Sequence, residues 1–235
     1  MGMSTRRRRG NRRSRRRFEH VVVLTALTAI GGGLVHLWWP SDQPTTQELS
    51  LLLGYTSLVA LGVTLALGPL NVLARRPNPR STDLRRDVGL WSAATGIVHI
   101  GFALQHHLDG VVAQYFFDDG RVALGSFPTT AFGRSNWLGV VAAAIIAVLA
   151  ATSNDRSVRA LGRRWTSIHR STYVLAAVIL VHSVLFWRVE QRMFAIRIAT
   201  GALAVGVFAL QVRGRRAVRA GRVQPDLAPT KPAVS

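Results

Sequence analysis

The 235-residue chain is 49% hydrophobic, carries a formal net charge of +19 and contains no cysteine. The lack of cysteine excludes disulfides, thiolate metal sites and covalent attachment of a c-type haem through C-x-x-C-H. Such a charge would suit a nucleic-acid-binding protein, but the apolar residues are gathered into six blocks of about 18 to 25 residues, the length that crosses a bilayer. The sequence therefore predicts an all-α integral membrane bundle of six transmembrane helices.

The chain opens with a basic cytoplasmic arm, residues 1–17, which contains "RRRRGNRRSRRR". A predicted membrane domain of residues 18–212 follows, with six spans: Phe18–Pro40, Leu49–Leu73, Val88–Leu108, Ser135–Ser153, Ser167–Trp187 and Met193–Val212. These are continuous runs rich in Leu, Ala, Val and Gly, unlike the alternating strands of about ten residues in a membrane β-barrel. Residues 213–235 end in a Pro-rich stretch and are expected to form a disordered cytoplasmic tail. No internal repeat is evident.

The basic residues predict the orientation of these spans. Nine Lys and Arg precede the first span, five lie from Arg75 to Arg86, five from Arg156 to Arg170, and six follow Val212, which is 25 of the 30 in the chain. This alternation is the positive-inside pattern, and it places both termini in the cytoplasm of a multi-pass cell-membrane protein. The surplus charge is therefore a topology signal that also attracts anionic membrane lipid, and no nucleic-acid partner is expected.

Seven histidines divide into two groups by their depth in the predicted spans. Four lie at span ends, where an exposed ring reaches water or the interfacial aromatic belt: His20, His36, His106 and His107. His99 and His182 lie well inside apolar spans, where an ionisable residue is expensive and by default marks a functional site. The alternative for each is a neutral imidazole hydrogen-bonded to a neighbouring helix. His169 lies on the same span as His182, and a third histidine favours the interpretation that these residues form a metal centre.

The surroundings of His99 and His182 narrow the kind of metal that they would bind. Imidazole ligates zinc, copper and iron, but no Asp, Glu or Cys accompanies these histidines in the apolar runs, as a zinc or non-haem iron site usually requires. Bis-histidine haem needs only two imidazoles from facing helices and an apolar pocket. Gly96 and Gly101 flank His99 and would let a flat macrocycle approach that helix.

A resemblance to the ferric reductase-like transmembrane domain lies in two stretches, "RRDVGLWSAATGIVH" (Arg85–His99) and "RRWTSIHRSTYVLAAVILVH" (Arg163–His182). It covers roughly residues 49–212. It is carried by R-x-x-G-L in the third span, W-x-x-x-H-R-x-x-Y at the start of the fifth, and the spacing of the two histidines in the fifth. Within that family the chain most resembles the small single-domain branch, the haem-binding membrane subunit of the methionine-sulfoxide reductase system.

Members of this family bind b-type haem between the third and fifth spans and pass electrons across the membrane. The resemblance therefore implies an outer haem b held by His99 and His182, and a role for His169 at a second, inner haem. In two-haem relatives a histidine near the start of the third span completes the inner pair, and this chain has Arg85 at that position. Arg85 would then contact a propionate, or a flavin or quinone would occupy the inner site instead.

Helix geometry supports two sites on the fifth span but raises two objections. The helical segment from His169 to His182 rises about 20 Å, which carries the two side chains towards opposite leaflets, yet it rotates by about 220°, so the two rings do not share a face. His99 also follows the cytoplasmic Arg86 more closely in the sequence than His182 follows Arg164. On depth alone His106 would match His182 better, and it is the alternative to His99.

The predicted function is electron transfer across the membrane, from a cytoplasmic flavin or quinol donor to an acceptor outside, in an oxidoreductase subunit that needs partner proteins. The segment after Val212 is short and contains no G-x-G-x-x-G that opens a strand-to-helix turn, so a separate flavoprotein, a bound flavin or membrane quinol would supply the electrons. The acceptor, for which a reductase is a candidate, would be reached through the loop of residues 109–135. The alternative is a non-redox polytopic protein, a transporter or a scaffold, although a transporter would be expected to have pseudo-symmetric halves or broken helices.

Overall fold

The computed structural model describes residues 3–38, 45–75, 83–106, 115–117, 130–189 and 194–221. Within these residues the regular elements are helices, and no strand occurs. The helices are α1 (Met3–Trp38), α2 (Thr45–Leu73), α3 (Asp83–His106), α5 (Ala131–Ala151), α6 (Asp155–Leu161), α7 (Arg163–Val189) and α8 (Phe194–Arg219). Five of the described helices, α2, α3, α5, α7 and α8, are long and apolar enough to cross a membrane. The prediction of an all-α, multi-pass membrane protein is confirmed for these five spans.

The five spans match the predicted apolar blocks from the second to the sixth, but their ends differ. α8 continues to Arg219, past the predicted end at Val212, because basic residues prolong a helix in water as readily as apolar residues do in lipid. The first predicted span, Phe18–Pro40, falls mainly on α1, which begins at Met3 and runs through the basic arm. Some residues of that span, like residues 222–235 of the predicted tail, lie outside the described part of the chain. The predicted span Phe18–Pro40, and with it the total of six spans, therefore stays a prediction.

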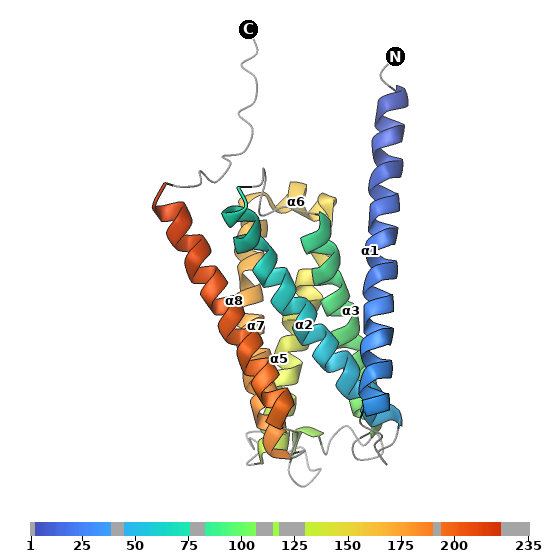
Figure 1. The fold of residues 1–235 in the computed structure, drawn as a ribbon, viewed down its shortest axis with the longest axis vertical. Helices are drawn as coiled ribbons and strands as arrows, with labels where there is room; N and C mark the ends of the chain where they lie inside the picture. The colour runs from blue at the N-terminus through green and yellow to red at the C-terminus, as the bar shows by residue number, and fades with distance from the viewer. Residues whose placement is uncertain are drawn as a thin grey trace.

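Successive long helices run in opposite directions and lie side by side in one bundle (Figure 1). α2 packs mainly against α3, and α5 mainly against α7; contacts of α3 with α5 and of α2 with α7 join the two pairs into a four-helix group. α8 packs along α2, and α1 lies against α3. The core of the group is apolar and consists of Leu61, Leu65, Ala142, Ile146 and Leu175.

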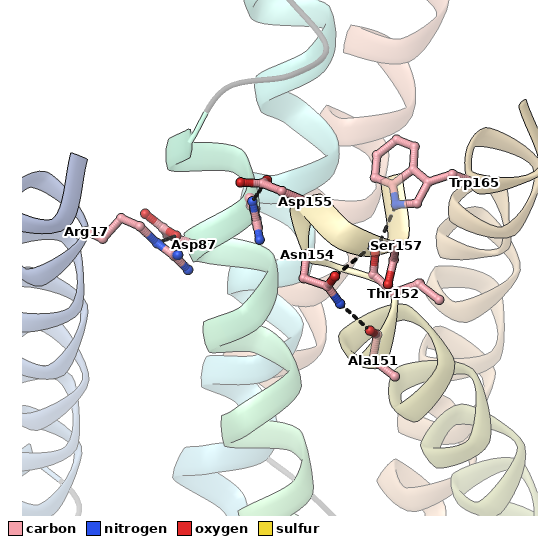
Figure 2. Close-up of polar contacts among 9 residues, drawn as sticks. Arg17, Asp87, Ala151, Thr152, Asn154, Asp155, Ser157 and Trp165 are labelled. Carbon is pink, nitrogen blue, oxygen red and sulfur yellow. Dashed lines mark hydrogen bonds and ion pairs between the residues drawn. The ribbon is translucent and has the colours of Figure 1, made fainter. Parts of the chain in front are cut away.

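Ion pairs attach two neighbouring helices to the first turns of α3 (Figure 2). Asp87, only 6% exposed, has its Oδ1 3.0 Å from Arg17 Nε and its Oδ2 2.8 Å from His20 Nδ1, both in α1. Arg86 Nη1 lies 2.7 Å from Asp155 Oδ1 in α6. His20, which the sequence predicted to be a solvated interfacial ring, therefore has a buried carboxylate as its partner.

Side-chain hydrogen bonds hold the turn between α5 and α7 (Figure 2). Asn154 Oδ1 accepts from the backbone N–H of Ser157 at 2.8 Å and caps α6, while Asn154 Nδ2 donates to the Ala151 carbonyl at 2.7 Å. Trp165 Nε1 donates to the Thr152 carbonyl at 3.0 Å. These bonds fix the start of α7 against the end of α5, and they position the histidine in the second turn of α7.

Candidate functional site

The imidazole of His99 in α3 lies against the backbone of α2. Its Nδ1 is 2.7 Å from the carbonyl oxygen of Ser50 and 3.1 Å from the Ser50 hydroxyl. One turn further along α2 is Gly54, where a Cβ would lie 3.0 Å from His99 Nδ1. The glycine therefore leaves the space that the ring needs to approach α2 so closely.

His182 in α7 has the same arrangement with α5. Its Nδ1 is 2.8 Å from the carbonyl oxygen of Ser135 and 3.0 Å from the Ser135 hydroxyl, which also donates to the His182 carbonyl at 3.0 Å. Gly139 follows one turn later, and a Cβ there would lie 3.5 Å from His182 Cε1. The pattern Ser-x-x-x-Gly, with both residues on one helical face, thus occurs in residues 50–54 and again in residues 135–139.

The hydrogen bonds to the serine carbonyls determine which ring nitrogen carries the proton. A carbonyl oxygen only accepts, so Nδ1 of His99 and of His182 is the donor. In a neutral imidazole the lone pair then lies on Nε2, the atom that can bind a metal. Metal-ligating histidines usually donate their other N–H to a carbonyl or carboxylate, which fixes the ring and raises its basicity as a ligand. Both side chains therefore have the chemistry of metal ligands.

His99 and His182 lie equally far from the last described residues of their helices. Each is about two turns from that residue, His106 in α3 and Val189 in α7, a rise of about 10 Å. Counted from the preceding arginines the depths are unequal, because α7, which begins at Arg163, has a longer stretch before its histidine than α3 has. The choice of His99 over His106 stays a prediction. The side chain of His106, the predicted alternative, lies outside the described residues, as does His107.

His169 lies near the opposite end of α7. Its Nε2 is 3.1 Å from the Thr152 hydroxyl, and the Trp165 indole stacks on its ring with centroids 4.0 Å apart. Arg85 of α3 lies against α2, where its Nε donates to the Thr64 carbonyl at 3.1 Å. Both residues lie near the end of the bundle at which α3 and α7 begin, far from the first two histidines.

The glycines beside His99 differ in what they face. At Gly96 a Cβ would lie 2.9 Å from the Ser57 hydroxyl, so this glycine allows close packing of α3 on α2. The prediction that Gly96 faces a cofactor is therefore wrong. The Cβ position of Gly101 has nothing within 4 Å, which is open space. Sequence reasoning missed the two Ser-x-x-x-Gly segments. Their signal is a repeated spacing, with a serine 49 positions before one buried histidine and 47 before the other.

The chemistry of the site is that of two imidazoles in an apolar helical group. Among the described residues, no three His, Cys, Asp or Glu side chains gather into a metal cage. Phe186 packs against the His182 ring, with centroids 5.0 Å apart, and adds apolar surface. The donor chemistry of each imidazole suits a metal cofactor that needs few ligands from the protein.

Comparisons with known proteins show the family of the chain. The family model described as "Ferric reductase like transmembrane component" matches residues 53–180, more than half of the chain. A protein of Bordetella pertussis named protein-methionine-sulfoxide reductase heme-binding subunit MsrQ is 31% identical over 134 residues, 57% of each chain. A protein of the same name from Brucella ovis is 32% identical over 152 residues, 63% of this chain and 62% of the relative. No solved structure matches the chain.

Proposed function

The chain belongs to the ferric reductase-like transmembrane component family, and from this premise we propose that it is a haem-binding electron-transfer subunit of the cell membrane. The family expected from the sequence motifs is confirmed. The relatives from Bordetella and Brucella are named heme-binding subunits, which supports the same role for this chain. The matched region spans less than two thirds of those relatives, so the activity and partners of the whole protein are part of the proposal.

The proposed cofactor is b-type haem, which His99 and His182 would hold through their imidazoles. One observation carries this assignment: in both rings Nδ1 donates to a serine carbonyl, at 2.7 Å and 2.8 Å, and Nε2 is the metal-binding atom. A histidine that only links two helices needs no counterpart, whereas these two share their type of partner and their tautomer. Haem iron, when bound, supplies one-electron chemistry between its ferric and ferrous states.

The side chains around the two rings orient the ligands and exclude water. Ser50 is 6% exposed and Ser135 is 0% exposed, so water does not compete for the hydrogen bonds that these serines make with the two histidines. Each ring is fixed in a single orientation, and this lowers the entropy lost when a metal binds to its Nε2 atom. The apolar packing around His182, including Phe186, lowers the local dielectric and thereby tunes the reduction potential.

We further propose that electrons enter from a cytoplasmic donor, a flavoprotein, a bound flavin or quinol, and leave to an acceptor outside, for which a reductase is the candidate. The direction rests on the positive-inside distribution, with six spans and both termini in the cytoplasm. In Figure 1, α1 begins at the same end of the bundle at which α8 ends, which supports an even number of crossings. A transporter or scaffold would give no role to two matched histidines.

An inner redox site at His169 is the second part of the proposal. Arg85 occupies the position where two-haem relatives are expected to have a histidine, and like His169 it lies near the end of the bundle at which α3 and α7 begin. A cation at this end favours an anionic or electron-accepting group, such as a haem propionate, a flavin or a quinone. Trp165 and Thr152 hold the imidazole from two other sides.

The test of the main assignment is the haem content of His99→Ala and His182→Ala proteins. Each variant should lose the b-type absorption bands and the bound iron porphyrin while remaining inserted in the membrane. His36→Ala is the matched control, because that side chain is 69% exposed and belongs to the last turn of α1. If both single variants retain full haem, the assignment of the ligands is wrong.

A further inference from the structure

Two buried hydrogen-bond donors, near the last described residues of α7 and the first of α8, have no acceptor among the residues that the structure describes. Arg197, in the first turn of α8, donates from Nη2 to the carbonyl oxygen of Trp187 in α7 at 3.1 Å. Its Nε and the indole Nε1 of Trp187 are buried, and neither makes a hydrogen bond to the residues that the structure describes. Buried polar groups are almost always paired, so two such donors in contacting residues indicate a missing acceptor.

The charge of Arg197 indicates that the acceptor is an anion. No ion pair within the described ranges of the chain includes this arginine. An arginine in a membrane-spanning helix is expensive unless an anion or water accompanies it. Because α8 begins at Phe194, the N–H groups of its first turn add positive potential beside the guanidinium.

The position of the two donors along the helices indicates which anion it is. Trp187 follows His182 in α7 by somewhat more than one turn, a rise of about 7.5 Å towards the end of the helix and a rotation of about 140° around it. Its indole therefore does not lie directly below the His182 ring but to one side, where Arg197 of α8 bonds to the Trp187 carbonyl. A carboxylate that extends from the edge of a macrocycle towards this end of the bundle would meet donors from both α7 and α8.

We propose that Arg197 and Trp187 form a carboxylate-binding site for a propionate of the haem that His182 is proposed to hold. The inference rests on the proposed function, because it requires haem at His182. Arg197 Nε and Trp187 Nε1 would each donate a hydrogen bond that they otherwise lack, and the bond from the guanidinium would be charge-assisted. The phosphate of an anionic lipid is an oxyanion with the same chemistry, and haem with esterified propionates distinguishes the two sources.

The experiment compares the binding of haem b and of its dimethyl ester, in which both carboxylate charges are removed. Purified haem-free wild type, Arg197→Gln and Trp187→Phe are titrated with each compound, and absorbance gives the dissociation constants. Arg188→Gln is the matched control, because Arg188 is an exposed arginine at the end of α7. Arg197→Gln should weaken haem b binding by about ten- to a hundredfold, and Trp187→Phe by about tenfold or less. The control should match the wild type.

Wild type and both variants should bind the dimethyl ester equally, because the ester has no carboxylate that Arg197 or Trp187 could bind. Equal weakening with both compounds would mean that Arg197 acts through packing, and this would overturn the inference. Unchanged haem binding in Arg197→Gln, with weaker binding of phosphatidylglycerol vesicles, would assign the site to lipid phosphate and overturn it as well. A wild type that binds neither compound would instead refute the proposed function, and the propionate site with it.

Discussion

Replacing Gly54 with alanine would place a methyl group against the imidazole of His99. The new Cβ would lie 3.0 Å from Nδ1 and 3.1 Å from Cε1, closer than the 3.4 Å at which ordinary contacts begin. The ring must then move by a few tenths of an ångström, which disturbs the 2.7 Å hydrogen bond to Ser50. Gly139→Ala is the matched control, because its Cβ would lie 3.5 Å from His182 Cε1, an ordinary contact.

Overpacking of this kind costs about 1–3 kcal/mol, which corresponds to a loss of about five- to a hundredfold in haem affinity. Both substitutions improve helix propensity by the same amount, about 1 kcal/mol, so this effect cancels in the comparison. We expect Gly54→Ala to weaken haem binding by this factor and to shift the electron paramagnetic resonance signal of the ferric haem. Gly139→Ala should stay within about twofold of the wild type, as a substitution without overpacking.

Haem titration followed by absorbance gives the two affinities, and electron paramagnetic resonance reports the orientation of the axial rings. Thermal unfolding of the haem-free proteins identifies a variant that has lost its fold. Equal haem affinities of Gly54→Ala and Gly139→Ala, whether both normal or both weakened, would contradict the prediction. The prediction rests on the closer contact of the new Cβ with His99 than with His182.

Two further predictions concern orientation and the inner site. A reporter fused after Ser235 should be active only in the cytoplasm and one inserted near Asp118 only outside, as the positive-inside pattern requires; an external C-terminus would contradict six spans. Analysis of bound haem, flavin and quinone should show that His169→Ala and Arg85→Ala lose a second group while the first haem spectrum is intact. If the wild type holds one haem and nothing else, and both variants transfer electrons at the normal rate, the inner site does not exist.

Hydropathy predicted most of the fold because lipid requires every backbone polar group to be paired within its own helix. It predicted the helix ends less well, because it marks where lipid ends and not where a helix ends. α8 therefore continues beyond Val212 to Arg219, and α1 begins at Met3 within the basic arm. The pairing of His20 with Asp87 was likewise not predictable, because those residues lie 67 positions apart in the sequence.

The candidate site was predictable only in part. His99 and His182 were identifiable because histidine is expensive in an apolar span, but their serine partners lie 49 and 47 positions away. Periodicity carries no information about which helices become neighbours. Despite the rotation of about 220° between His169 and His182 in an ideal helix, both rings contact the same neighbouring segment, at its opposite ends. One bonds to Ser135 in the first turns of α5, and the other to Thr152 just beyond its last turn.

The pairing of α2 with α3 and of α5 with α7 has a consequence for how the protein assembles. Each histidine and its serine belong to one antiparallel hairpin, whose two helices pack mainly on each other. Membrane helices insert first and associate afterwards, so each hairpin can orient its own imidazole before the two hairpins meet. A metal bound by both Nε2 atoms would then cross-link two preformed halves, and cofactor capture would complete the tertiary structure of a chain whose helices are already in the membrane.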